Sequence, residues 1–550
     1  MLSNVSTQSE PTSIGARILN WFFGPRLRFK FGALESTVLS IYVVLLTWTL
    51  AHHIPWADEA QAWQLSRELS LPALFAHYLR LEGAPGLWYI PLWILARMHV
   101  SFLGMRWIMA VFPVAGIWVF LRYSPFPAVL RVTLPFSFYL LYQYGVVSRS
   151  YIMLPLLVFT VAILFAQPAR NLIALAVVLS LLGNLSAHGF CIAAGLACML
   201  AIRLWRERKR DPQLLTSRRL AIATTCLVAC WCFSVWTVFP TLDNRYQPVW
   251  YRIHHPNEFV DTQWASVRLP AGTDAGVSET TLDRHIRESR GLKHVFYRYT
   301  RAATYGLSNS WVLSSIAIGV LLIYLMTHGN LVDILPYIFL QLLFELVIAH
   351  AWHLGALFVA FIGILWIDWP ASEKENDPVW RGILSLALLA IVVEQCFWTV
   401  HAIRTDVTGK YSGDKDAAAF LASHIEGKRV AGFQYHSVGV LPYFSRNIFY
   451  NQPKDAIWYW SKTVPIDERA LEVVEERPDY IDIGFAVHAH GNTLSAAADP
   501  GWIDRYQPGI EKEILDTGRY VETHRFCGDA FSGHGYDEGE CQAILEPAAH

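Results

Sequence analysis

The chain has 550 residues, of which 54 % are hydrophobic and 16 % are charged, whereas soluble domains carry about 25 % charged residues. It therefore holds more apolar side chains than one soluble core can bury, which is typical of a membrane protein. Lys and Arg number 44 and Asp and Glu 45, so the formal net charge is -1. This balance removes any argument from bulk charge for nucleic-acid binding. Membrane lipids are the expected surroundings because of the apolar composition.

Apolar runs of roughly membrane-spanning length begin after residue 33. Residues 1–33 carry four basic residues and one acidic residue and lack a small-residue cleavage site, so they are predicted to be a cytoplasmic flank and not a signal peptide. The predicted apolar runs are 34–53, 86–103, 105–121, 132–148, 151–166, 171–183, 188–203, 220–240, 308–327, 331–350, 354–369 and 382–400.

The basic stretch 203–219 sets the predicted topology, because basic loops stay in the cytoplasm. Seven apolar runs separate it from the cytoplasmic N-terminus, an odd number, so one run does not cross. The run 86–103 contains Gly86, Pro91 and two Trp residues, which favours a helix in the membrane interface. The alternative, in which 86–103 crosses and another run is re-entrant, stays open.

We therefore expect a polytopic α-helical membrane domain over 34–400 with about eleven spans. Its external loops would be about 54–104 and 241–307. Residues 401–550 have a soluble composition and a mixed helix and strand pattern, which predicts an extracytoplasmic α/β domain. Cys527 and Cys541 lie in this part and could form a disulfide outside the cytoplasm.

Two adjacent carboxylates, Asp58 and Glu59, follow the first apolar run within a few residues. Carboxylates near a membrane boundary are costly if they face lipid, so they must face water, a metal or a partner. One interpretation is an acidic first turn of a helix over 58–68, favoured by the helix dipole. The other is a general base or a hard divalent-metal ligand pair at an external active site.

Further motifs occur in a fixed order after this pair and lie on the same predicted side of the membrane. The motifs are Glu82-Gly83-Ala84-Pro85-Gly86-Leu87-Trp88-Tyr89, Arg149-Ser150-Tyr151, Ser186-Ala187-His188 and His350-Ala351-Trp352-His353. Together with the Asp58-Glu59 pair, they resemble the GT-C superfamily of membrane glycosyltransferases, which includes protein O-mannosyltransferases and the aminoarabinose transferases acting on lipid A. The segment 82–89 departs from the family pattern, because Ala84 replaces its first His and Gly86 its second Pro.

The resemblance implies a plasma (inner) membrane enzyme that moves a sugar from a polyprenyl-phosphate donor to an extracytoplasmic lipid, glycan or protein. By the family pattern Asp58 is the general base, and Glu59 supports it or helps to bind a metal. One Asp-Glu pair fits schemes with and without a divalent cation such as Mg²⁺ or Mn²⁺, so metal dependence stays open.

A lipid-linked phosphate needs a cationic side chain at the external mouth of the membrane domain. Arg149, with Tyr151 and His188, is the candidate for this contact; the structural alternatives are a snorkelling arginine, an interfacial tyrosine and a buried histidine. Further candidates for substrate or metal contacts are Glu82, Arg245, His350 and His353.

Two other functions compete with the glycosyltransferase. In a transporter or flippase of a lipid-linked or anionic substrate, the same polar residues would line a translocation route. The gathering of these residues on one side of the membrane disfavours that function. In a non-catalytic assembly protein, the external domain would bind envelope components.

Overall fold

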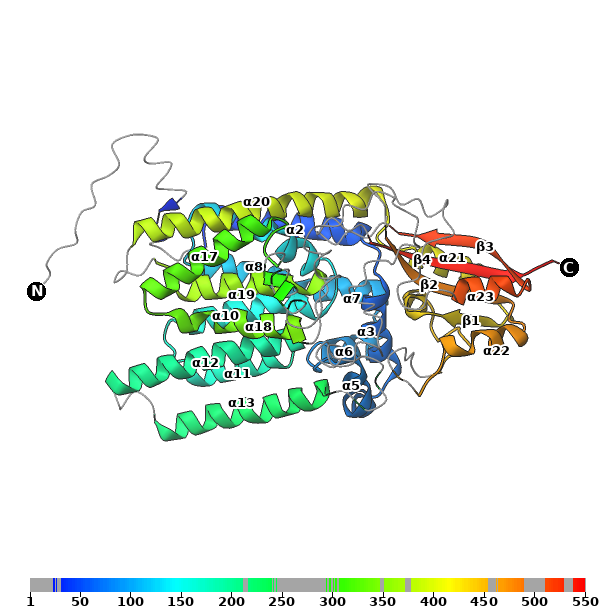
Figure 1. The fold of residues 1–550 in the computed structure, drawn as a ribbon, viewed down its shortest axis with the longest axis horizontal. Helices are drawn as coiled ribbons and strands as arrows, with labels where there is room; N and C mark the ends of the chain where they lie inside the picture. The colour runs from blue at the N-terminus through cyan, green and yellow to red at the C-terminus, as the bar shows by residue number, and fades with distance from the viewer. Residues whose placement is uncertain are drawn as a thin grey trace, which may run out of the picture.

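The structure is a computed structural model, and it describes residues 31–210, 216–239, 306–346, 351–370, 377–453, 463–488, 510–528, 538–549 and a few isolated positions. A helix bundle forms one end of an elongated molecule, and a small β-sheet with its own helices forms the other (Figure 1). A layer of short helices lies between the two ends.

The bundle is built from long apolar helices, as the composition predicts. Among the described residues, five helical stretches are long and apolar enough to cross a membrane. They are α2 (Ala33–His52), the consecutive pair α7 (Phe102–Met109) and α8 (Val111–Tyr123), α12 (Ala187–Arg210), α13 (Ser217–Val238) and α20 (Pro378–Thr408).

Shorter helices complete the bundle. They are α9 (Ala128–Thr133), η2 (Leu134–Phe136), η3 (Phe138–Gln143), η4 (Ser150–Met153), α10 (Leu154–Leu164), α11 (Leu172–Gly183), α17 (Trp311–Thr327), η5 (Leu331–Ile334), α18 (Leu335–Leu346), η6 (Ala351–His353) and α19 (Gly355–Ile367). A helical membrane protein is therefore confirmed, whereas the number of eleven spans stays a prediction.

The apolar run predicted at 132–148 is not one continuous helix. It is divided among the end of α9, η2 and η3, and Pro135 lies inside η2. Proline lacks the backbone N–H that a regular helix needs and crowds the preceding turn, so a regular helix is interrupted there. Hydropathy alone does not report this interruption.

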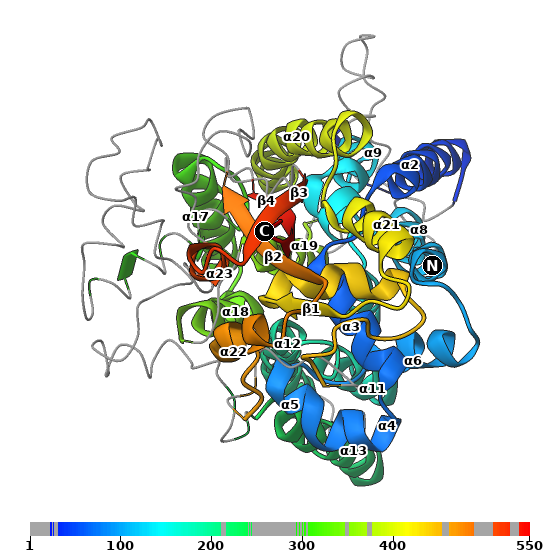
Figure 2. The same ribbon diagram turned by 90° about the vertical axis from the view of Figure 1, so that its right-hand side faces the viewer.

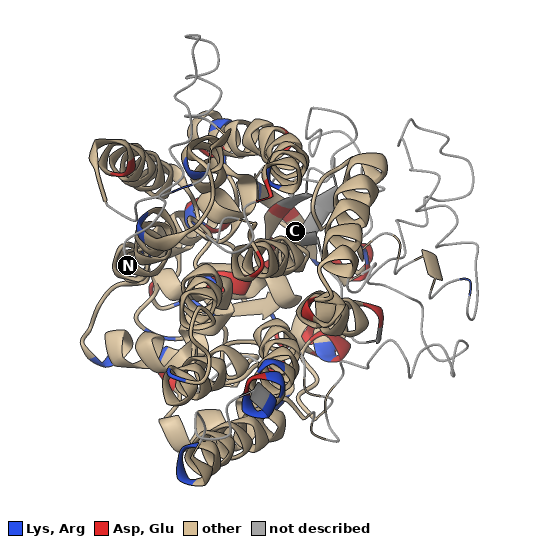
Figure 3. Cartoon of the chain, turned by 90° about the vertical axis from the view of Figure 1, so that its left-hand side faces the viewer, with Lys and Arg blue, Asp and Glu red and all other residues tan. Residues whose placement is uncertain are grey.

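Basic residues gather at the end of the bundle that lies away from the sheet. The C-terminal part of α12 and the first turn of α13 meet there, and Lys and Arg colour both (Figure 3). The outer faces of the helices expose large apolar side chains, among them Trp48, Trp236, Trp311 and Phe397. Such a surface suits lipid.

The layer between bundle and sheet contains α3 (Ala57–Glu68), α4 (Leu71–Ala73), η1 (Leu74–Tyr78), α5 (Leu79–Glu82) and α6 (Tyr89–Arg97). With 9 residues, α6 is far shorter than the about 20 residues that a membrane span needs. Ile90, Ile94 and Met98, spaced four apart, are exposed, whereas Leu92 and Leu95 are buried. This one-sided pattern agrees with the predicted interfacial helix.

The chain after α20 forms the C-terminal unit, defined here as the described residues from 409 onward. Its sheet has the order β1-β2-β4-β3, with β1 parallel to β2 and the other pairs antiparallel. The helices and strands of this unit agree with the mixed helix and strand pattern of residues 401–550 in the sequence. The elements are α21 (Asp414–His424), β1 (Val430–Phe433), η7 (Tyr435–Tyr443), η8 (Asp467–Arg469), α22 (Ala470–Glu475), β2 (Tyr480–His488), α23 (Ile510–Asp516), β3 (Tyr520–Cys527) and β4 (Glu538–Pro547).

The C-terminal unit lies across the end of the bundle, above the layer of short helices (Figure 2). Its helix η7 packs on α3. Cys527 of β3 and Cys541 of β4 are directly opposite each other and form a disulfide. The structure thus forms the disulfide that the sequence left open for these two residues.

Candidate functional site

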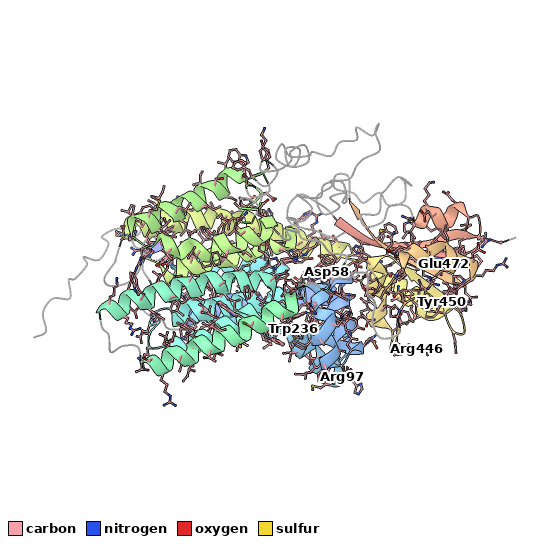
Figure 4. All side chains as sticks on the ribbon, turned by 60° about the horizontal axis from the view of Figure 1, so that its bottom comes forward. Asp58, Arg97, Trp236, Arg446, Tyr450 and Glu472 are labelled. Carbon is pink, nitrogen blue, oxygen red and sulfur yellow. A yellow bond between two sulfur atoms is a disulfide. The ribbon has the colours of Figure 1, made fainter. Side chains whose placement is uncertain are left out.

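The site is built around the first turn of α3, which begins five residues after α2 ends. Asp58 and Glu59 both lie in this turn, where the positive end of the helix dipole favours carboxylates. The sequence therefore forms the acidic helix start that one interpretation predicted. Figure 4 labels Asp58, which lies where the bundle, the short helices and the C-terminal unit meet.

Asp58 is held by a cation and a phenol from two distant segments. Arg149, which precedes η4, forms an ion pair with Asp58 Oδ2, and the side chains are 27 % and 16 % exposed. The hydroxyl of Tyr435, the first residue of η7, donates a hydrogen bond of 2.8 Å to Asp58 Oδ1. The pair is thus partly shielded from water while both members keep some access to it, which strengthens their attraction relative to a fully exposed pair.

Glu82 is a second carboxyl group at the site. It ends α5, and Gln61 Nε2 of α3 donates to its Oε1 at 3.1 Å. Burial raises the pKa of Glu82 to about 7; the hydrogen bond from Gln61 and the charge of Arg149 oppose this rise, and Asp58 adds to it. Glu82 is therefore a group that changes protonation near neutral pH beside the Asp58–Arg149 pair.

A histidine and tyrosine cluster follows Arg149 in the chain. The Tyr151 hydroxyl and His188 Nδ1 are 3.1 Å apart, and the His188 and His353 ring centroids are 4.6 Å apart. Both histidines are buried, and His188 Nε2 has no hydrogen-bond partner among the described residues. The structure thus brings Tyr151, His188 and His353 together. His350 and Arg245 lie outside the described residues.

Glu59 points away from Asp58 into a fully buried charge network. Its Oε2 is 3.2 Å from His53 Nε2, and its Oε1 accepts a hydrogen bond of 2.8 Å from the backbone N–H of Ser148. The other ring nitrogen of His53 lies 3.2 Å from Asp406 Oδ2 of α20, and Tyr142 also donates to that oxygen, at 2.9 Å. This network ties α3 to the ends of α2 and α20.

The charge of His53 follows from its two partners. Burial alone would lower the pKa of His53, but Asp406 and Glu59 outweigh burial and raise it to about 9. His53 is therefore a cation between two carboxylates at neutral pH, and its charge lowers the pKa of Glu59 against the effect of burial. Glu59 therefore holds the first turn of α3, which carries Asp58, against the ends of α2 and α20.

The two carboxylates proposed as metal ligands do not converge on one point. Asp58 contacts Arg149 and Tyr435, whereas Glu59 contacts His53. Within the described part of the chain, no group of three or more His, Cys, Asp or Glu side chains is arranged to hold a metal ion.

Sequence reasoning missed Tyr435 and Asp406. Tyr435 is 377 residues from Asp58 and belongs to no motif, so no local pattern could identify it. Asp406 had a usable signal, since a carboxylate in the last turn of an apolar helix needs a partner. His53 lies beside the acidic pair in sequence, but that position alone did not distinguish a network member from an interfacial histidine.

Comparison of the chain with models of protein families and with curated proteins finds no match.

Proposed function

We propose that the protein is a membrane glycosyltransferase that moves a sugar from a polyprenyl-phosphate donor to an extracytoplasmic hydroxyl of a lipid, glycan or protein. The observation that carries this proposal is the Asp58–Arg149 ion pair at the end of the helix bundle. A carboxylate and a guanidinium side by side are what the reaction needs, because one group accepts a proton while the other holds a phosphate.

In the proposed reaction, Asp58 takes the proton from the acceptor hydroxyl as its oxygen attacks the anomeric carbon of the sugar. The bond between that carbon and the phosphate oxygen breaks, and polyprenyl phosphate leaves with the bonding electrons. Arg149 stabilises the negative charge of the departing phosphate. Asp58 then loses its proton to water, which restores the starting state.

The contacts of the resting site support this division of roles. Arg149 is paired with Asp58, so an arriving phosphate competes with the carboxylate for the guanidinium. When the phosphate binds the guanidinium of Arg149, Asp58 loses its cationic partner and keeps the hydrogen bond from Tyr435. A carboxylate that is no longer neutralised by an arginine is the better proton acceptor. Donor binding would in this way prepare the base.

This function requires that the end of the molecule with the β-sheet lies on the extracytoplasmic side of the plasma membrane. The basic ends of α12 and α13 lie at the opposite end of the bundle, and basic loops favour the cytoplasm. The disulfide of the C-terminal unit suits an oxidising compartment. The N-terminus would then be cytoplasmic and the acceptor a component of the cell envelope.

The experiment uses purified protein in lipid nanodiscs. Polyprenyl phosphate and a panel of polyprenyl-phosphate sugars are titrated with and without Mg²⁺ or Mn²⁺, and sugar transfer is measured with each acceptor class. We expect Asp58→Asn to keep donor binding and to lose about 10²–10⁴ in rate, as removal of a general base does. We expect Arg149→Ala to lose donor binding.

Two variants serve as matched controls. Glu68→Gln changes a carboxylate of the same helix that is paired with Arg67, and Arg404→Ala changes an exposed arginine near the end of α20. Both should bind donor and turn over like the wild type. Absence of binding to any polyprenyl phosphate would overturn the proposal, and movement of lipid-linked substrate across the membrane without sugar transfer would support a flippase instead.

A further inference from the structure

The N-terminus of α3 is completed by residues that lie almost at the other end of the sequence. Both carboxylate oxygens of Glu540 in β4 lie 3.2 Å from the backbone nitrogen of Ala57, the first residue of α3. The next residue, Asp58, accepts the hydrogen bond from Tyr435. Because the first N–H groups of a helix have no partner within it, Glu540 supplies an acceptor that α3 itself does not contain.

Glu540 is itself held firmly in place. Its backbone carbonyl accepts hydrogen bonds from Gly528 at 2.9 Å and from Gly413 at 3.3 Å, and its side chain contacts His436 Nδ1. A Cβ on Gly413 would lie 2.1 Å from the carbonyl oxygen of Phe526, and one on Gly528 2.4 Å from the Cα of Ser412. The close backbone approach around Glu540 therefore requires glycine at both positions.

The disulfide lies beside Glu540 in the chain. Cys541 follows Glu540 in β4, and its bond to Cys527 joins β4 to β3 at the end of their paired region. Gly528, which binds the Glu540 carbonyl, follows Cys527. The disulfide therefore fixes both segments that define the position of Glu540.

We propose that Tyr435 and Glu540 are positioning residues for Asp58, and that the Cys527–Cys541 disulfide holds the strand that carries Glu540. In this arrangement the C-terminal unit is part of the site, because it sets the position of the first turn of α3. The kinetic consequence rests on the proposed glycosyltransferase function, whereas the structural consequence does not.

Losing these contacts has a defined physical effect. Removing an acceptor from the N-terminus of a helix should make the first turn open about 2–30-fold more often. Asp58 would then spend less time in its held position. The turnover number should fall while the KM for donor stays within about twofold, since the phosphate contact of Arg149 remains.

The test measures backbone hydrogen exchange of the full-length protein in nanodiscs, resolved over residues 57–60. We expect Glu540→Ala to speed exchange there by several-fold to about 30-fold, and Glu540→Gln to retain much of the protection because its amide oxygen still accepts. Glu546→Gln, on the same strand and bonded to Thr523, is the control and should leave exchange unchanged. Tyr435→Phe tests the second contact, because it removes the hydroxyl that donates to Asp58 and leaves the volume of the side chain almost unchanged.

The disulfide is tested separately. A mild reductant should speed exchange over 57–60 in the wild type, and it should have no further effect on a Cys527→Ser, Cys541→Ser double variant, which should exchange faster from the start. Reduction of the bond, measured by thiol labelling, must accompany the change.

Each outcome decides between the proposals. Unchanged exchange over 57–60 in folded Glu540→Ala and in the reduced protein would overturn positioning by the C-terminal unit. If Glu540→Ala does not fold, Tyr435→Phe decides: wild-type exchange and an unchanged turnover number would overturn it equally. Faster exchange in a protein that shows no sugar transfer would uphold positioning and refute the glycosyltransferase.

Discussion

At the scale of single residues, the two neighbouring carboxylates in the first turn of α3 differ in their exposure and in their partners. Asp58 is partly exposed and paired with Arg149, whereas Glu59 is fully buried against cationic His53. The sequence identifies the pair as important, because adjacent acids beside an apolar run need partners. It cannot say which acid faces the bundle, since that depends on Asp406 and Tyr435, which are remote in the chain.

Substitution of the two acids should separate stability from chemistry. Glu59→Ala removes one of the two carboxylate partners of buried His53 and the acceptor of the Ser148 backbone N–H, and removing one member of a buried ion pair costs up to about 3–5 kcal/mol. We expect a clearly lower melting temperature and lower yield of the purified protein, measured by scanning fluorimetry. Asp58→Asn should melt within about 2 °C of the wild type, because it disturbs only a partly exposed pair. Equal melting temperatures for wild type and Glu59→Ala would contradict this reading of the network.

The resting ion pair also predicts the sign of an affinity change. In Asp58→Asn the guanidinium of Arg149 is no longer held by a carboxylate, so polyprenyl phosphate meets no competitor. We expect it to bind the variant at least as tightly as the wild type, with a gain of up to about tenfold from a partly exposed pair. Weaker binding by a folded Asp58→Asn protein would show that the carboxylate contributes directly to the lipid phosphate contact.

At the scale of elements, the C-terminal unit contains carboxyl groups that burial keeps protonated at unusually high pH. Burial is the main cause that raises the pKa of Glu540 in β4 to about 8, and it raises the pKa values of Asp414 and Asp482 in the same direction. Both carboxylate oxygens of Asp482 lack a hydrogen-bond partner among the described residues. Ionising such groups in the folded state is unfavourable.

This burial makes the stability of the unit depend on pH. A carboxyl group with a raised folded-state pKa contributes its stability below the unfolded pKa of about 4.5 and loses it as the pH rises through the folded value. We therefore expect the melting temperature to fall between about pH 5 and pH 8, and Glu540→Gln to flatten this dependence. His436 and Asp414 face the same group, so Glu546→Gln, a change at a partly exposed position on the same strand, is the comparison. A wild type whose melting temperature rises over this interval would refute the assignment.

The elements differ in how well the sequence predicts them. Long apolar helices such as α2, α13 and α20 follow from hydropathy, and the strands of the C-terminal unit follow from alternation, because both patterns are local. The division of 132–148 and the order of strands β2, β4 and β3 depend on proline placement and on long-range pairing. The proline is a local signal that hydropathy alone does not carry, whereas the strand order is not encoded in any short window.

At the scale of the whole molecule, charge and apolar surface predict how the protein sits in a membrane. The basic ends of α12 and α13 and the C-terminal unit lie at opposite ends (Figures 1 and 3). We expect a cysteine introduced at exposed Ser423 to react with a membrane-impermeant maleimide in intact cells. One introduced at exposed Arg206 should react only after permeabilisation. Labelling of the unsubstituted protein gives the background, and the reverse pattern would invert the topology.

The contact between Glu540 and Ala57 joins residues 483 positions apart. During synthesis, the ribosome completes α3 long before the strand that caps it, and translocation must deliver that strand to the same side of the bilayer. A nascent chain that has been synthesised only as far as η4 therefore holds Asp58 and Arg149 without the contacts from Tyr435 and Glu540. Assembly of this site would accordingly wait until β4 has been synthesised and paired with β3 and the Cys527–Cys541 bond has formed.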